Sequence, residues 1–177
     1  KERKNSRIML RIAVQSKGRL FDDTMNLLSE ADIKVPTSKR TLLVKSSNFP
    51  IEVLYLRDDD IPETVADGVA DIGIVGENEF MERNENAQII SRLGFSKCRP
   101  SLAIPKAIDY KGIEWFNGKK IATSYPNILR RFINKKGINA DIHVITCPTT
   151  IILMVKVKSV VVNLCLANKS KTCLAFL

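Results

Sequence analysis

The sequence has 177 residues, of which 45% are hydrophobic and 27% are charged, a composition typical of a soluble globular protein and not of a disordered one. Its formal net charge of +9 is concentrated at the two ends: residues 1–8 carry +3 and residues 130–177 carry +7, so the body between them carries −1. A nucleic-acid-binding protein needs a basic stripe on its folded body, and this distribution argues against one.

The cysteines and the single histidine favour neither a structural metal site nor a disulfide framework. Cys98, Cys147, Cys165 and Cys173 form no CxxC pair, and His143 lies far along the chain from any candidate nucleophile. A reduced, cytoplasmic setting therefore fits best. The apolar runs IILMV and VVVNLCLA are too short to span a bilayer, and the basic start is not followed by the apolar core of a signal peptide.

The first half of the chain alternates strand and helix patterns. Apolar residues recur at helical spacing from Leu20 to Ala31, and Asp22 and Asp23 follow in the first turn, where the helix dipole favours them. The near-continuous apolar run ADIGIV is typical of a strand covered on both faces of a parallel sheet. The patterns predict strands at Met9–Gln15, Thr41–Lys45, Ile51–Leu56 and Ala70–Val75, and helices at Leu20–Ala31, Ile61–Asp67 and Glu77–Arg83.

The second half continues the alternation up to residue 146. Pro126 near the start and Gly137 just past the end mark a helix at Tyr125–Lys136. Short connections between alternating elements predict a mostly parallel α/β sheet, in a first lobe at 9–96 and a second, partial lobe at 97–146. The expected strands of this half are Gln88–Leu93, Ser101–Ile104, Lys119–Thr123 and Ile142–Thr146.

The two ends of the chain differ from this pattern. Residues 147–177 contain no glycine, aspartate or glutamate, although an α/β lobe needs turn residues and helix caps. One interpretation is a tail of β-branched strands packed against the lobe; the other is sequence that no longer belongs to the fold. Residues 1–8 raise the same question, since Met9 directly precedes the first strand. We therefore expect a foreign extension at 1–8 and a divergent tail at 147–177.

Three polar segments follow predicted strands, which is where open parallel sheets bind their ligands. After the first strand, Gly18 lets the backbone approach a ligand, and amides at the next helix start favour an anion. Arg19 can bind a phosphate through its planar fork and Lys17 as a point charge, although a solvated turn is the simpler interpretation of these cations. The three segments are Lys17-Gly18-Arg19, Arg57–Asp60 and Gly76-Glu77-Asn78.

The segment Arg57–Asp60 has two interpretations. Either its arginine faces a phosphate while a carboxylate holds Mg²⁺ or a ribose hydroxyl, or the loop is solvated and one aspartate caps the helix that begins at Ile61. For any single aspartate we favour the cap. Arg40 is either an edge cation of the site or a surface charge. Ser124 and Tyr125, at a strand-to-helix junction, either contact a ligand or cap the helix.

Five motifs are more specific in combination than singly: QSKGRL, KRTLLV, LRDDDIPETVADGVADIGIVGEN, RLGFSKCRPSLAIP and NGKKIATSYPNILRRF. In this order and spacing they resemble the ATP phosphoribosyltransferases of histidine biosynthesis, and RDDDIP and GENEF are similar to the long-form class. The resemblance covers about Met9 to Thr146. It implies a two-lobed α/β fold of the periplasmic-binding-protein kind, with its second lobe incomplete here.

The resemblance also implies an activity. Such an enzyme joins N1 of the ATP adenine to C1 of phosphoribosyl pyrophosphate, with Mg²⁺ as cofactor, and releases pyrophosphate without a covalent enzyme intermediate. It implies a cytoplasmic homohexamer, and catalytic roles for Arg40 and Arg57. Its implied substrate- and nucleotide-binding residues are Lys17, Gly18, Arg19, Asp71, Glu77, Asn78, Ser124 and Tyr125.

The chain departs from the family after HVIT. The family continues to a Thr-Gly-x-Thr type loop that grips the 5′-phosphate of phosphoribosyl pyrophosphate, whereas no glycine follows Gly137 and no aspartate follows Asp141 here. We expect this loop and the histidine-binding regulatory domain to be absent, and catalysis to be weak or lost, in a copy truncated or altered after about residue 146. A non-catalytic nucleotide-binding remnant and a non-functional fragment remain open alternatives.

Overall fold

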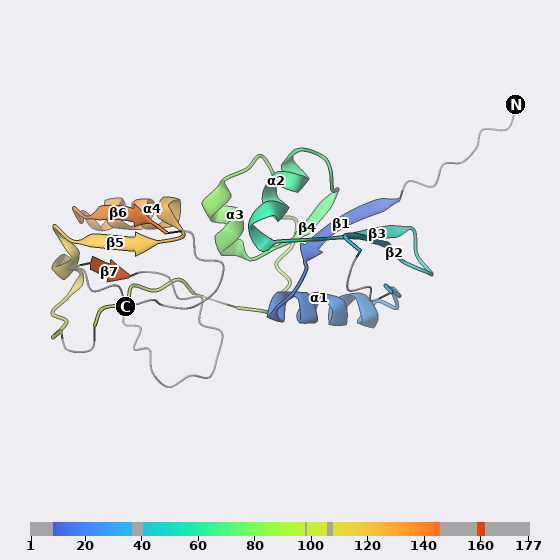
Figure 1. Ribbon diagram of the computed structural model, residues 1–177, viewed down its shortest axis with the longest axis horizontal. Coiled ribbons are helices and arrows are strands. Elements are labelled where there is room, and N and C mark those ends of the chain that lie inside the picture. The colour runs from blue at the N-terminus through green and yellow to red at the C-terminus, as the bar shows by residue number, and fades with distance from the viewer. Residues whose placement is uncertain (1–8, 37–40, 98, 106–107, 146–158, 162–177) are drawn as a thin grey trace, which may run out of the picture. The chain divides into compact units, whose positions relative to one another are not determined.

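The computed structural model describes residues 9–36, 41–97, 99–105, 108–145 and 159–161 (Figure 1). The chain divides into two compact units, Lys1–Ser96 and Lys97–Leu177. Each unit has its own sheet and its own apolar core, and each is described by itself below.

The first unit is built on a four-stranded sheet with the strand order β2-β3-β1-β4 (Figure 1). The central strand β1 runs parallel to both of its neighbours, β3 and β4, and only the edge strand β2 is antiparallel. This arrangement confirms the predicted mostly parallel sheet. The strands are β1 (Leu10–Gln15), β2 (Leu43–Lys45), β3 (Ile51–Leu56) and β4 (Ile72–Ile74).

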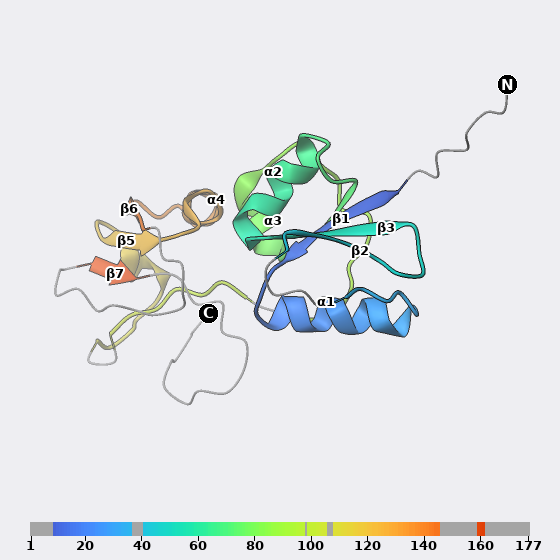
Figure 2. The ribbon, with the colours of Figure 1, turned by 45° about the vertical axis from the view of Figure 1, so that its right-hand side comes forward.

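Helices lie on both faces of this sheet (Figure 2). On one face, Leu28 of α1 (Arg19–Glu30) packs in a buried cluster with Ile12 and Val53 of the sheet. On the other face α2 (Ile61–Ala66) packs on β1 and β4, beside α3 (Glu77–Arg83). The approach of α2 requires Gly73, because a Cβ there would lie 2.7 Å from Cγ2 of Ile61.

The second unit has a three-stranded parallel sheet with the order β6-β5-β7. A short 3-10 helix, η2 (Ile113–Phe116), precedes β5 (Lys120–Thr123), and α4 (Pro126–Lys136) leads to β6 (Asp141–Val144); β7 is Ser159–Val161. Five buried residues form the core: Phe116, Ile121, Leu129, Ile133 and Ile138.

The helix predictions are confirmed to within one or two residues at each end. The expected helix after the first strand is α1, the short helix after RDDD is α2, and the helix ending before Gly137 is α4. Gly137 has the left-handed conformation, with φ 67°, and its N–H is bonded to the last turn of α4, as a terminating glycine does.

Two strand predictions are wrong. Residues 88–93 and 101–104 have no strand conformation. A strand forms only where a neighbouring strand takes its backbone hydrogen bonds, and neither segment pairs with a strand of the described part of the chain. Ile90 is accordingly 78% exposed. No helix in the described ranges has the length and apolar character needed to cross a membrane.

Candidate phosphate-binding site

Three polar segments leave the first unit's sheet at the same edge. Gln15 of β1 is paired with Leu56 of β3, and Val14 of β1 with Ile74 of β4, so these parallel strands end side by side. The backbone N–H of Ser16 donates to the carbonyl of Leu56 at 2.8 Å, which holds the first two segments together just past their strands. The carboxyl edge of the sheet therefore brings together three of the predicted segments: 17–19, 57–60 and 76–78.

The first segment presents cations and a helix start to solvent. Lys17, Gly18 and Arg19 are all exposed between β1 and α1. Gly18 has φ 95° and ψ −177°, a conformation that is essentially restricted to glycine. The first hydrogen bond of α1 runs from the N–H of Asp22 to the carbonyl of Gly18. The backbone N–H groups before Asp22 therefore have no acceptor within this 12-residue helix and are directed beyond its N-terminal end. Backbone and side chains here combine into a surface suited to an anion.

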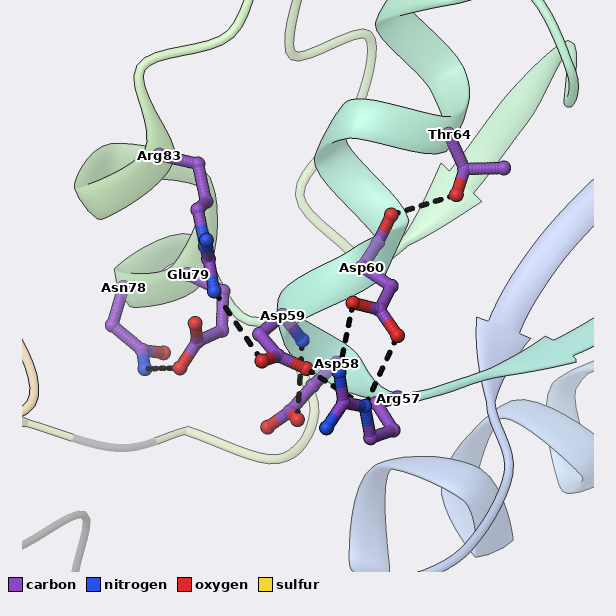
Figure 3. Close-up of polar contacts among 8 residues, drawn as sticks. All are labelled: Arg57, Asp58, Asp59, Asp60, Thr64, Asn78, Glu79 and Arg83. Carbon is purple, nitrogen blue, oxygen red and sulfur yellow. Dashed lines mark hydrogen bonds and ion pairs between the residues drawn. The ribbon is translucent and has the colours of Figure 1, made fainter. Parts of the chain in front are cut away.

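The second segment holds its arginine in a network of carboxylates (Figure 3). Arg57, whose side chain is 73% exposed, donates from Nε and Nη2 to the two carboxylate oxygens of Asp60, at 3.1 and 3.3 Å. Its Nε also lies 3.6 Å from Oδ1 of Asp59. The Asp60 hydrogen bonds, followed by the charges of Asp59 and Asp60, raise the pKa of Arg57 above its ordinary value, so the guanidinium stays charged.

The expected aspartate cap on this segment is wrong. Asp60 occupies the position before α2, but its side chain makes no capping hydrogen bond. The carboxylate turns to Arg57 instead, and only the main-chain carbonyl of Asp60 serves the helix, accepting from Oγ1 of Thr64 at 2.7 Å. The bidentate pair with Arg57 thus takes the place of the cap.

The third segment carries a second ion pair. Glu77, the first residue of α3, accepts from Nη2 of Arg92 at 2.9 Å. This hydrogen bond lowers the pKa of Glu77 and raises that of Arg92. Beside it, Nδ2 of Asn78 donates to Oε1 of Glu79 at 3.3 Å. The side chain of Asn78 lies close to Gly76: a Cβ at residue 76 would be only 2.6 Å from its Oδ1.

Asp71 lies at the other end of the sheet. It precedes β4, and its carboxylate accepts the backbone N–H of Arg11, near the start of β1, at 2.7 Å. Its own N–H donates to the carbonyl of Arg11 at 2.9 Å. The structure therefore does not bring Asp71 to the carboxyl edge where the other three segments meet; there its contacts join β4 to β1.

The two candidates of the second unit lie between β5 and α4. The hydroxyl of Ser124 is fully buried and has no hydrogen-bond partner among the described residues, while the N–H of Tyr125 donates to Oγ1 of Thr123 at 2.9 Å. A buried hydroxyl without a partner is unusual and calls for an explanation. Arg40, the remaining candidate, lies outside the described residues.

No group of three or more His, Cys, Asp or Glu side chains in the described ranges is arranged to hold a metal ion by itself. The acidic triplet Asp58–Asp60 offers a metal ion at most a single carboxylate, because Asp59 and Asp60 are paired with Arg57. Asp58 makes no ion pair within the part of the chain that the structure describes; one of its oxygens accepts the N–H of Asp59 at 3.2 Å.

Two cations of this edge were not predicted from the sequence. Arg83, the last residue of α3, donates from Nη2 to Oδ2 of Asp59 at 3.3 Å, and Arg92 pairs with Glu77. Both contacts join residues 15 or more positions apart, and no local pattern signals them. The only sequence signal for Arg83 is its place in the last turn of a helix, which suits any cation.

Comparison with known proteins identifies relatives that match most of the chain. A family model described as "HisG: ATP phosphoribosyltransferase" matches residues 57–169. The ATP phosphoribosyltransferase of Bacteroides thetaiotaomicron is 76% identical over 138 residues, which cover 78% of this chain and 49% of the relative. That of Cytophaga hutchinsonii is 50% identical over 138 residues, covering 78% and 48%. The chain thus spans about half the length of the curated relatives it matches.

A solved structure extends the likeness to the fold. The ATP phosphoribosyl transferase (HisG:HisZ) complex from Thermotoga maritima matches with a TM-score of 0.68 and 26% identity, covering 88% of this chain and 73% of the other. This match confirms the predicted α/β fold with mostly parallel sheets. The match of the family model continues to residue 169, past the position at which we expected the resemblance to end.

Proposed function

Because this chain belongs to the ATP phosphoribosyltransferase family, we propose that the carboxyl edge of its first sheet binds the phosphates of that reaction's substrates. The reaction is the transfer of a phosphoribosyl group to ATP, the first step of histidine biosynthesis, in the cytoplasm. The observation that carries the proposal is the convergence of Lys17, Arg19 and Arg57 on one edge, beside the open start of α1.

In the proposed reaction, N1 of the ATP adenine forms a bond to C1 of phosphoribosyl pyrophosphate. The bond from C1 to the pyrophosphate oxygen breaks, and pyrophosphate leaves with the electron pair. The chain's part is to position the two substrates and to stabilise the growing negative charge on the leaving group, which suits fixed cations and backbone amides. Lys17, Arg19 and Arg57 are the proposed groups, with Arg40 as a further cation.

The remaining candidates have supporting roles in this proposal. Glu77 and Asn78 border the phosphate site from the β4 side, and Asp71 supports it indirectly by joining β4 to β1. The buried hydroxyl of Ser124, next to Tyr125, is proposed to form a hydrogen bond with a ligand of the second unit.

Magnesium fits the donor set as an ion that arrives with the substrate. Mg²⁺ is usually held by substrate phosphates, waters and one or two carboxylates and not by an all-protein cage. Of the acidic triplet, Asp58 is the carboxylate without an ion pair in the described ranges, and we propose that it supports the ion. When bound, Mg²⁺ neutralises part of the pyrophosphate charge.

The test is ligand-induced stabilisation of the full chain. The thermal midpoint is measured with Mg²⁺ against increasing ATP and, separately, phosphoribosyl pyrophosphate, because a ligand that binds only the folded state adds about 2.7 kcal/mol of stability at a hundredfold excess over its Kd. We expect a saturable rise that Lys17→Gln and Arg57→Gln both reduce. Lys34→Gln removes an exposed cation paired with Asp32 at 3.9 Å and serves as the control, expected to leave the rise unchanged.

The outcomes separate the possibilities. A rise with both ligands, with phosphoribosyl-ATP formed on mixing them, supports the transferase. A rise with ATP alone and no turnover supports nucleotide binding without catalysis. If neither ligand stabilises the folded chain, the proposal is overturned.

Assembly is a separate part of the proposal. The family implies a homo-oligomer, whereas the solved neighbour is a HisG:HisZ complex. We propose that this chain self-associates, and light scattering of the purified chain should then give a mass above that of one copy. A monomeric mass at every concentration tested would contradict this part and leave the ligand proposal standing.

A further inference from the structure

The carboxylate of Asp59 lies between two guanidinium groups (Figure 3). Its Oδ1 is 3.6 Å from Nε of Arg57, and its Oδ2 accepts from Nη2 of Arg83 at 3.3 Å. Arg57 comes from the end of β3, whereas Arg83 comes from the far end of α3. The pair between Asp59 and Arg83 therefore ties the arginine's loop to a helix that begins at the third polar segment.

Two carboxylates beside Arg57 oppose any phosphate that approaches it. Asp60 engages Nε and Nη2 of the arginine, and Asp59 adds a second negative charge. An arginine has five N–H donors, and Nη1 of Arg57 makes no hydrogen bond within the described part of the chain. Asp60 thus orients the side chain and leaves donors for a ligand, while Asp59 contributes mainly repulsion unless another cation neutralises it.

We propose that Arg83 is a positioning residue for the phosphate site: it holds and neutralises Asp59, so that Arg57 is available to a substrate phosphate. This inference rests on the proposed function, because it takes Arg57 to be a phosphate ligand. Without Arg83, Asp59 has Arg57 as its remaining partner, and its charge lies unscreened where the phosphate would bind. Both effects weaken the binding of an anion.

The same contacts have little effect on folding. The side chains of Asp59 and Arg83 are 36% and 43% exposed, and ion pairs this exposed contribute little to stability. A purely structural role would therefore leave ligand affinity unchanged, whereas the positioning role changes affinity and leaves the ligand-free midpoint nearly constant. This difference makes the two roles separable by experiment.

The experiment is a double-mutant cycle on ligand affinity in the full chain, with ATP and phosphoribosyl pyrophosphate as parallel probes in the presence of Mg²⁺. Arg83→Gln should weaken binding by about 3- to 10-fold, and Arg83→Lys, which keeps the charge, should stay within about twofold of the unaltered chain. In an Asp59→Asn background, where there is no charge to neutralise, Arg83→Gln should have no further effect. Lys34→Gln again controls for the loss of one exposed cation.

Two kinds of failure are distinguishable. If Arg57→Gln weakens neither probe, the phosphate role of Arg57 fails, and the inference fails with it. If Arg57→Gln weakens a probe but Arg83→Gln has no effect, or has the same effect with and without the Asp59 charge, the positioning role alone is wrong. A fall in the ligand-free midpoint of Arg83→Gln with affinity preserved would likewise assign Arg83 a structural role.

Discussion

At the scale of single residues, the candidate residues differ in whether their polar groups already have a partner. The guanidinium of Arg57 and the carboxylate of Glu77 already have partners in the ligand-free chain. The hydroxyl of Ser124 is buried and has no partner in the part of the chain that the structure describes, although the neighbouring hydroxyl of Thr123, also buried, accepts the N–H of Tyr125. Two adjacent hydroxyls of one strand-to-helix junction thus differ in their hydrogen bonding within the described residues: that of Thr123 has a partner and that of Ser124 has none. This difference can be tested directly.

Ser124→Ala should leave the stability of the ligand-free chain unchanged or slightly higher, because the hydroxyl it removes makes no hydrogen bond within the described ranges. Thr123→Val is the matched control: it leaves the N–H of Tyr125 without its acceptor and should cost about 1–3 kcal/mol. Urea unfolding measures both. A loss of more than about 1 kcal/mol in Ser124→Ala would mean that the serine hydroxyl has a partner in the folded chain. If the hydroxyl serves a ligand, the variant should also show a smaller midpoint rise with that ligand.

The sequence predicted where these polar segments lie in the fold better than it predicted their contacts. Lys17, Gly18 and Arg57 follow strands, so their place at the carboxyl edge comes from the βα pattern alone. The engagement of Asp60 with Arg57, in place of a helix cap, depends on a competition between two hydrogen bonds of similar local geometry. The contact of Arg83 with Asp59 joins residues 24 positions apart, and no short motif contains it.

At the scale of elements, a ladder of charges crosses three strands of the first sheet. Glu52 of β3 lies in register between Lys45 of β2 and Arg11 of β1. Its carboxylate accepts from Nη2 of Arg11 at 3.0 Å and lies 3.5 Å from Nζ of Lys45, and the residue is only 8% exposed. Because a buried charge needs its partners, this ladder favours one register between the antiparallel edge strand and the parallel core of the sheet.

The ladder predicts an acid-sensitive stability. The hydrogen bond from Arg11, opposed by desolvation, lowers the pKa of Glu52 below its ordinary value of 4.5. A carboxyl whose pKa is lower in the folded than in the unfolded chain stabilises the fold above the unfolded pKa, and this stabilisation is lost as the pH falls through the folded pKa. Glu52→Gln should therefore be less stable than the unaltered chain near pH 7, and the difference should shrink below about pH 4.5.

Urea midpoints at a series of pH values measure this difference. Glu63→Gln, on the exposed side of α2, is the control and should show no such pH-dependent difference. A gap between Glu52→Gln and the unaltered chain that stays constant down to about pH 3 would contradict the assigned role of Glu52, because the carboxylate would then not be the group that stabilises the ladder.

Elements with strong local signals were predicted correctly, whereas two predicted strands did not form because a strand also depends on pairing. The helix α4 has a proline at its start and a glycine after its end, and its apolar face is continuous. The segment 88–93 contains the β-branched pair Ile89 and Ile90, but a strand also requires a neighbour, which the local sequence does not reveal. The short helix η2 and the three-residue strand β7 are too brief to leave a period in the sequence.

At the scale of the whole molecule, each of the two units has an apolar core of its own. The first unit's core includes Ile12 of β1, which packs in one cluster with Leu28 of α1, and the second unit's core includes Ile121 of β5. The proposed phosphate site belongs to the first unit, whereas the buried hydroxyl of Ser124 belongs to the second. If the two units unfold together, a ligand bound to one unit also stabilises the other; if each unfolds independently, it does not.

We predict that each core stabilises mainly its own unit. Ile12→Val and Ile121→Val remove the same methylene from two buried sites, and each should cost about 0.5–1.5 kcal/mol. Hydrogen exchange of the full chain should then quicken by roughly 2- to 10-fold in the strands of the altered unit, and little in those of the other. Ile12→Val should affect β1 and β3, and Ile121→Val should affect β5 and β6. Equal acceleration in both sheets by either variant would show instead that the units unfold as one, and a ligand bound at the edge of the first sheet would then protect the second to the same extent.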